Sequence, residues 1–181
     1  MNLLFLLQQT LIIAPPILIT AVGACISEKS GVVNIGLEGT MLSAAFATAT
    51  VNIMTGNPYL GILAGIIVGG LISALHAVIS IHLKGNQIIS GVAINLFAVA
   101  TTSFLIKTIF KAAGSTPTAD SLANKKVVII TIYTIAILTY FFLYKTVLGL
   151  RIRAVGEHPL AADTVGISVY KVRYISVIMS G

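Results

Sequence analysis

The stretch SGVVNIGLEG, Ser30 to Gly39, decides how the rest of the chain must fold, because it places three glycines, an asparagine and a carboxylate between two apolar runs. Glycine forms helix poorly, so an uninterrupted helix through these residues is disfavoured. Within a bilayer, irregular backbone is tolerated only where it is buried in protein or lines a watery cavity. If the flanking runs lie in a membrane, the stretch predicts a broken or re-entrant helix near residues 28–39.

The composition indicates that the flanking runs do lie in a membrane. The 181 residues are 57% hydrophobic and 9% charged, with a mean hydropathy of +1.03, whereas soluble domains carry roughly a quarter charged residues. About 20 apolar residues cross a hydrocarbon core of about 30 Å. The sequence therefore predicts an all-α membrane protein, a polytopic transmembrane helix bundle. The apolar runs cover residues 3–26, 36–54, 59–81, 88–106, 127–144 and 174–181.

Three features of these runs carry further predictions. Pro15-Pro16 should kink or break the first run, because proline removes backbone donors. Gly61, Gly65 and Gly69 form a GxxxGxxxG face that lets two helices approach closely. The last run, 174–181, is too short to span a bilayer, so we expect the chain to stop inside a helix and the domain to be incomplete at its C-terminus.

The net charge of +6 does not indicate nucleic-acid binding, because the basic residues flank apolar runs instead of forming a patch. Basic loops are typical of the cytoplasmic side of membrane proteins. Alternation of the runs puts residues 82–87 and 149–173 on one side and the polar loop 107–126 on the other. The first side carries more Lys and Arg, so we predict that residues 149–173 of this multi-pass membrane protein face the cytoplasm.

The opening stretch has the polar groups that a solute site needs. In a broken helix, the half-helix after Gly36 would present free N–H groups, and Ser30, Asn34 and Glu38 would complete a small polar site of the kind that transporters use. A carboxylate at membrane depth is itself a sign of function. The alternative is a connection at the membrane surface, with the charged side chains among lipid headgroups.

A second stretch, GNQIISGVAIN, Gly85 to Asn95, resembles the first. Its Ser-Gly-Val at 90–92, followed by an asparagine, echoes the Ser-Gly-Val at 30–32. An asparagine facing lipid is costly, so Asn95 should face protein or a cavity; a structural hydrogen bond between helices is the alternative. The candidates for the solute path are therefore Ser30, Asn34, Glu38, Gln87 and Asn95.

A third stretch, GLRIRAVGEHPLAADTVGISVYKVR, Gly149 to Arg173, is too polar to cross a membrane. Pro159 suits the first turn of a short helix, and Gly166 suits its C-terminal cap. Ala161 and Ala162 are small enough for close docking. We expect a short helix along the cytoplasmic face, placed to receive force from a separate motor protein; a loop in contact with lipid headgroups is the alternative.

In this order, separated by apolar helices, the three stretches resemble the permease subunits of bacterial ABC importers, in the subgroup that serves nucleosides and simple sugars and is related to branched-chain amino acid permeases. The resemblance covers about residues 15–181 and implies a multi-pass protein of the bacterial plasma (inner) membrane. It implies one transmembrane permease domain over residues 1–181, with a cytoplasmic coupling loop at 149–173 that docks on an ATPase. Family members continue for several more helices. The candidates for ATPase contact are Arg151, Glu157, Pro159, Ala161, Ala162 and Gly166.

The resemblance also implies partners: a second permease subunit, a cytoplasmic ABC ATPase and an extracytoplasmic solute-binding lipoprotein, in contact with membrane lipid. The sequence has no P-loop GxxxxGK[ST], so ATP would be bound by the partner and this chain would need no cofactor. His76 and His82 are six residues apart, which does not match the i, i+4 spacing of a zinc pair. His158, with Glu157 and Asp163, is read as a solvated loop cluster. We predict no catalytic and no metal site.

The predicted function is transport: a permease subunit of an ATP-driven importer that forms the path for a nucleoside or sugar-like solute. A branched-chain amino acid or simple-sugar ABC permease is the nearest alternative. An ion-coupled secondary transporter with Glu38 as its ion site, and a structural membrane assembly factor, are alternatives from other classes.

Overall fold

The computed structural model describes residues 3–112, 114–117 and 125–181, and the described residues form helices and no strands. The all-α fold predicted from the sequence is thereby confirmed. The helices are α1 (Leu3–Ile13), α2 (Pro15–Lys29), α3 (Leu37–Thr55), α4 (Pro58–Ala77), the π-helix η1 (Val78–His82), α5 (Gln87–Phe110), α6 (Lys125–Lys145), α7 (Val147–Glu157), α8 (Pro159–Thr164) and α9 (Val169–Ser180).

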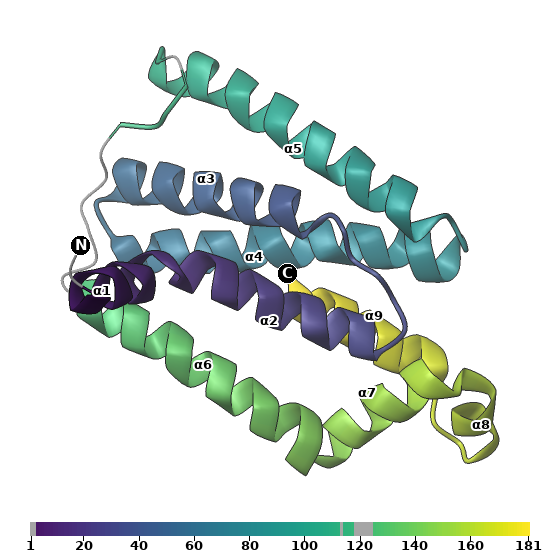
Figure 1. The fold of residues 1–181 in the computed structure, drawn as a ribbon. Coiled ribbons are helices and arrows are strands. Elements are labelled where there is room, and N and C mark those ends of the chain that lie inside the picture. Colours follow the sequence, from purple (N-terminus) through teal and green to yellow (C-terminus); the bar gives the residue numbers. More distant parts are fainter. Residues whose placement is uncertain (1–2, 113, 118–124) are drawn as a thin grey trace.

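The helices pack in two groups with α9 between them (Figure 1). Helices α3, α4 and α5 form one group, in which α3 contacts both of the others. Helices α2 and α6 form the second group, and α9 contacts α2 and α4. The short helices α7 and α8 lie together at one end of the bundle and lead the chain from α6 into α9.

The proline pair breaks the first apolar run, as predicted. Helices α1 and α2 meet at an angle of 55° around Ala14. Pro15 and Pro16 occupy the first turn of α2, where missing backbone N–H groups cost least because no helical partner exists for them. The break therefore falls one residue before the prolines.

The glycine face of α4 packs on α3, which confirms the predicted close approach. A methyl group built on Gly61 would lie 2.6 Å from the carbonyl oxygen of Thr48. On Gly65 it would meet the hydroxyl of the same Thr48. The turn between the two helices has Gly56 at φ 64°, and the Asn57 side chain accepts a hydrogen bond from the Tyr59 N–H at the start of α4.

Three described helices are long and apolar enough to cross a membrane: Pro58–His82, Gln87–Phe110 and Val128–Lys145. The bent α1–α2 pair makes a fourth if it counts as one span. Helix α3 is not among them, although residues 36–54 were expected to be a full apolar run. Its sequence contains Glu38, Asn52 and several threonines, which lower its hydropathy.

Two predicted loops are shorter than expected. The loop was predicted at 107–126, but α5 continues to Phe110 and α6 begins at Lys125. Residues 113 and 118–124 lie outside the described part of the chain. In the segment 149–173, the predicted short helix is present as α8, but α7 precedes it and α9 begins at Val169, before the predicted start at residue 174. Helix α7 was missed because charged residues interrupt its apolar ones along the sequence, although Ile152 and Val155 share a buried face.

The glycine face generates a stability prediction. Gly65→Val should lower the free energy of unfolding by about 1–3 kcal/mol, because the added side chain would collide with Thr48. Gly70→Val is the matched control on the same helix, since a methyl group there has no neighbour within 4 Å. Thermal unfolding of both variants in detergent would test this, and equal midpoints would contradict it.

Candidate functional site: an unwound segment inside the helix bundle

Residues 30–36, here called the unwound segment, join the end of α2 to the start of α3 without forming helix. Gly31 adopts φ +82°, a conformation that glycine reaches without strain. Beyond it the side chains alternate: Val32 and Asn34 are buried, whereas Val33 and Ile35 are each 41% exposed. The segment is therefore extended, with one face in the bundle and one face out.

The unwound segment lies well inside the bundle. Its Val33 N–H donates to the side-chain oxygen of Gln87, the first residue of α5, and Asn95 is bound to backbone groups at both ends of Ile35–Gly39. Eight residues of helix separate the two amides, which corresponds to roughly 12 Å along the α5 axis. The predicted broken or re-entrant helix near 28–39 is therefore present, and it enters the bundle instead of lying across its end.

Side chains from the neighbouring helices pair the free backbone groups of the unwound segment. Asn95 of α5 accepts from the Gly39 N–H at 2.7 Å and donates to the Ile35 carbonyl at 3.1 Å. His76 of α4, which is 1% exposed, lies with Nε2 3.2 Å from the Val33 carbonyl. Its Nδ1 is 3.0 Å from the hydroxyl of Ser90 on α5. These contacts hold the extended backbone against α4 and α5.

The remaining contacts come from α2 and α9. The Ser27 hydroxyl donates to the Val32 carbonyl at 2.8 Å. Arg173 Nε donates to the Ser30 carbonyl at 3.2 Å, and Asn34 Nδ2 donates to the hydroxyl of Ser180 at 3.2 Å. Buried backbone groups without partners cost free energy, so this pairing is what allows the chain to unwind there.

The structure brings together Ser30, Asn34, Gln87 and Asn95, four of the residues that the sequence assigned to the solute path. Each is engaged in a hydrogen bond that shapes the unwound segment. The Ser30 hydroxyl donates to the Ser27 carbonyl at 2.6 Å, and the Asn34 side-chain oxygen accepts from the Gly36 N–H at 3.1 Å. Their structural role is the alternative that the sequence left open for Asn95; contact with solute stays a prediction.

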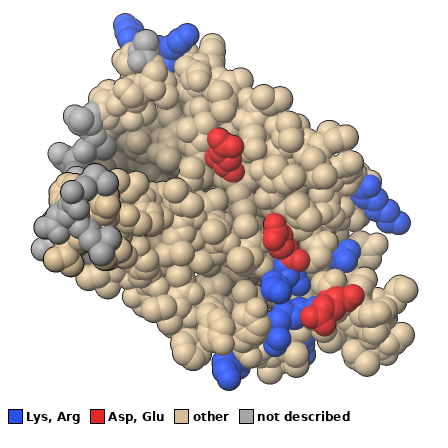
Figure 2. All heavy atoms as spheres, viewed as in Figure 1, with Lys and Arg blue, Asp and Glu red and all other residues tan. Residues whose placement is uncertain are grey.

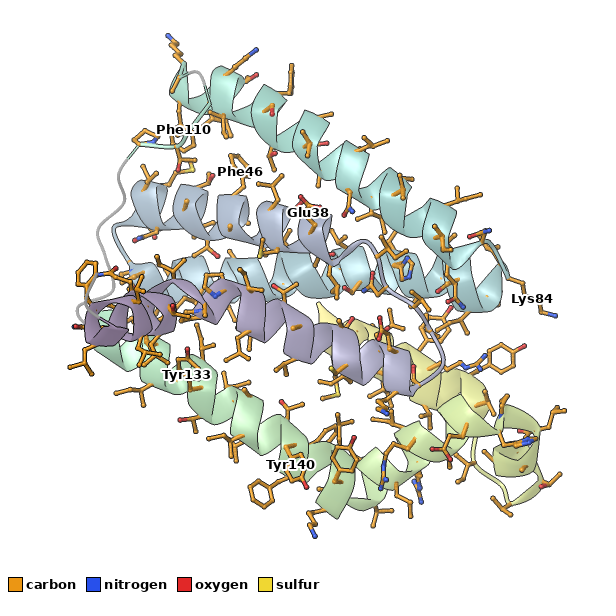
Figure 3. The ribbon with its side chains drawn as sticks, in the orientation of Figure 1. Glu38, Phe46, Lys84, Phe110, Tyr133 and Tyr140 are labelled. Atoms are coloured by element: carbon orange, nitrogen blue, oxygen red, sulfur yellow. The ribbon has the colours of Figure 1, made fainter. Side chains whose placement is uncertain are left out.

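Glu38, the fifth candidate, has a different environment. It lies in the first turn of α3 and is exposed, and a carboxylate is favourable there because the helix N-terminus carries partial positive charge. Figure 3 places it at the start of α3, and in the same view Figure 2 shows a lone acidic side chain surrounded by uncharged residues. It lines an open cavity of about 320 Å³, together with Ile17, Thr20, Ala21, Ala24 and Met41.

The candidates for ATPase contact lie on α7 and α8. Arg151, Glu157, Ala161 and Gly166 are exposed, and Pro159, half-buried, starts α8 as predicted. Gly166 follows α8 with φ +83°. Ala162 is only 4% exposed, so its methyl group packs against neighbouring parts of the bundle, and contact with an ATPase stays a prediction.

Most of the charged side chains in Figure 2 gather at this end of the molecule, further basic side chains lie at the opposite end, and one acidic side chain lies alone between them. Charged ends and a nearly uncharged middle are the pattern expected of a bundle that crosses a membrane and meets water at both ends. A cavity of about 360 Å³ separates α8 from the π-helix and α9, lined among others by Ser80, Lys84, Asp163 and Tyr170.

Sequence reasoning missed several residues that build the site. His76 was considered only as a zinc ligand, although an ionisable residue in an apolar run was a signal in itself. Arg173 was grouped with the basic flank of the loop, and Ser180 with the final apolar run. Among the described residues, no group of three His, Cys, Asp or Glu is placed to hold a metal ion.

Comparison with known proteins decides the family. The sequence pattern of the family described as branched-chain amino acid transport system / permease component matches residues 6–181. The chain belongs to this family. Together with the apolar helices, this makes it a multi-pass protein of the plasma membrane, as predicted. No solved structure matches the chain.

Three relatives illustrate the family. The guanosine ABC transporter permease protein NupQ of Bacillus subtilis is 41% identical, over 97% of this chain and 63% of that protein. The nucleoside ABC transporter permease protein NupC of Lactococcus lactis is 36% identical, over 99% of this chain and 64% of that protein. The putative glucose ABC transporter permease protein TsgC13 of Haloferax volcanii is 36% identical, over 97% and 59%. The chain thus spans about three fifths of the length of these relatives.

The pairing of the unwound segment predicts a stability effect at Asn95. Asn95→Leu should lower the free energy of unfolding by about 2–4 kcal/mol, because two backbone groups lose their partner. Thr108→Leu is the control: it replaces a polar residue on the same helix whose hydroxyl bonds only to the preceding turn. If the two variants had the same thermal unfolding midpoint in detergent, the structural role of Asn95 would be wrong.

Proposed function

We propose that this chain belongs to a permease subunit of an ATP-driven importer and borders the path of a nucleoside or sugar-like solute. The family membership and the printed names of the relatives, which are guanosine, nucleoside and putative glucose permease proteins, support this proposal. The relatives favour a nucleoside over a sugar, because the guanosine permease is 41% identical to this chain and the putative glucose permease 36%. The chain has no catalytic role in this scheme.

The observation that carries the proposal is the unwound segment. A helix that breaks well inside a bundle leaves backbone groups and polar side chains where a solute can meet them, which is how transporters of several folds build their sites. Its outer face carries Val33 and Ile35, and Glu38 follows it at the start of α3. Apolar contacts with a base, and hydrogen bonds that sugar hydroxyls donate to a carboxylate, suit this combination.

The partners follow from the same proposal. A cytoplasmic ABC ATPase binds and hydrolyses ATP, and it docks on the end of the bundle formed by α7 and α8. A second permease subunit completes the path, and an extracytoplasmic solute-binding lipoprotein delivers the solute. The exposed surface of α8 supports the docking role, since Leu160 is 79% and Val165 73% exposed although both are apolar.

Uptake assays with the full-length protein and its partners test the proposal. Labelled guanosine should enter cells that produce the complex, uptake should require ATP, and a protonophore should leave uptake intact while ATP is maintained. Uptake of labelled glucose or leucine instead would reassign the solute. Collapse of uptake under the protonophore would favour an ion-coupled transporter and overturn the proposal.

Glu38 provides a test of the solute path. Glu38→Gln should raise the KM for uptake about ten-fold, because a charge-assisted hydrogen bond to solute becomes a neutral one. Glu28→Gln is the control, since Glu28 is also an exposed carboxylate but is not among the residues that line the 320 Å³ cavity. A KM shift of the same size in both variants, or in neither, would remove Glu38 from the path.

The docking surface is tested at Leu160. Leu160→Asp should weaken co-purification of the ATPase with the permease about ten-fold or more, because an exposed apolar contact is replaced by a charge. Thr164→Asp is the control for added charge alone, because Thr164 lies on α8 like Leu160 and is also exposed. Unchanged co-purification of the Leu160 variant would place the ATPase contact elsewhere.

A further inference from the structure

We propose that α9 is the element that transmits movement of α8 to the unwound segment, through one helical face that contacts every second residue of that segment. The inference rests on the proposed docking of an ATPase at α7 and α8, and it assigns roles to Arg173, Val177 and Ser180. None of the three was a candidate on sequence grounds.

The three residues share one face of α9, because they are spaced at i, i+4 and i+7. Each meets a different level of the unwound segment. Arg173 Nε donates to the Ser30 carbonyl at 3.2 Å. Val177 belongs to the same buried apolar cluster as Val32. The Ser180 hydroxyl accepts from Asn34 Nδ2 at 3.2 Å.

The contacts follow the order of both chains. Ser30 is still in a helical conformation and Gly31 has φ +82°, so the chain turns there and is extended only from Val32. Residues 30, 32 and 34 nevertheless meet residues 173, 177 and 180 of α9 in that order. The two elements therefore run side by side over three successive contacts, and α9 holds the buried face of the segment while Val33 and Ile35 remain on the other face.

A second contact fixes the beginning of this assembly. Gly156, near the end of α7, packs directly on the backbone at the end of α2: a methyl group there would collide with the Lys29 carbonyl oxygen and lie 3.2 Å from the Gly31 nitrogen. On Gly31 a methyl group would lie 3.2 Å from the Arg173 guanidinium. Helices α2, α7 and α9 thus meet at the first residues of the unwound segment.

These contacts link the proposed docking surface to the proposed path. Four residues separate the end of α8 from the start of α9, so a displacement of α8 reaches α9 directly, and α9 leads back into the bundle beside α2 (Figure 1). Buried, close-packed groups transmit displacement instead of absorbing it. Val32 and Val177, at 1% and 0% exposure, are such groups. The unwound segment consequently moves with α9.

The test uses the complete transporter, with its ATPase and binding lipoprotein, reconstituted in liposomes. The quantity measured is labelled guanosine taken up per ATP hydrolysed. Arg173→Gln should lower this ratio about ten-fold, as expected for the loss of a charge-assisted hydrogen bond, and Arg173→Lys should restore part of it because a lysine can still donate. Lys145→Gln, an exposed cation at the end of α6, is the control for loss of charge at this end of the bundle.

A second pair of variants avoids any large change in the fold. Ser180→Ala removes the partner of Asn34 and should lower the ratio about five-fold. Ser176→Ala is matched to it: Ser176 is buried on the same helix, but its hydroxyl bonds only to the Val172 carbonyl of that helix. The Ser176 variant should keep the wild-type ratio.

The outcomes separate the inference from the proposed function. If the wild-type complex shows no ATP-dependent uptake of guanosine, glucose or leucine, the proposed function fails. If the wild-type complex transports and both Arg173→Gln and Ser180→Ala match their controls in uptake per ATP, transmission through α9 is wrong. A variant that only misfolds would lower the amount of complex without changing uptake per ATP in the complexes that form, which also counts against transmission.

Discussion

The structure depends on one constraint: the backbone of residues 30–36 lies inside a membrane bundle and needs partners that a helix would otherwise supply. Five helices contribute to this pairing. Gln87 and Asn95 come from α5, His76 from α4, Arg173 and Ser180 from α9, and Ser27 from α2, while α3 provides the Gly39 N–H. The helices of the bundle are consequently held together by their shared contacts with the unwound segment.

Glycines allow α3 and α5 to approach closely beside the unwound segment. A methyl group on Gly39 would lie 2.8 Å from the Cα of Asn95, and one on Gly91 would lie 2.8 Å from the Gly36 nitrogen. The amide of Asn95 reaches two backbone groups only because α3 and α5 approach this closely. The hydrogen bonds therefore depend on the close packing: with a larger residue in place of glycine where α3 and α5 meet, the Asn95 amide would be too far from the backbone to bond.

Much of the fold could be predicted from the sequence, because apolar runs, prolines and glycines act locally. The break at Pro15-Pro16, the glycine face of α4 and the interruption after α2 all follow from single-residue chemistry. The partners of the interruption could not be predicted, since His76, Arg173 and Ser180 meet it across separations of 43 to 146 residues. Ala162 shows the same limit: its small size predicted docking, but only the packing of α8 shows that the methyl group points inward.

The alternating burial of the unwound segment has a consequence for its length. Val32 and Asn34 face α9 while Val33 and Ile35 face away, and this parity is fixed at one end by Gly31 and at the other by the start of α3. Inserting or deleting a single residue would exchange the two faces, presenting an amide outward and turning branched aliphatic side chains toward Val177 and Ser180. The number of residues in this stretch is therefore as much a part of the structure as their identity.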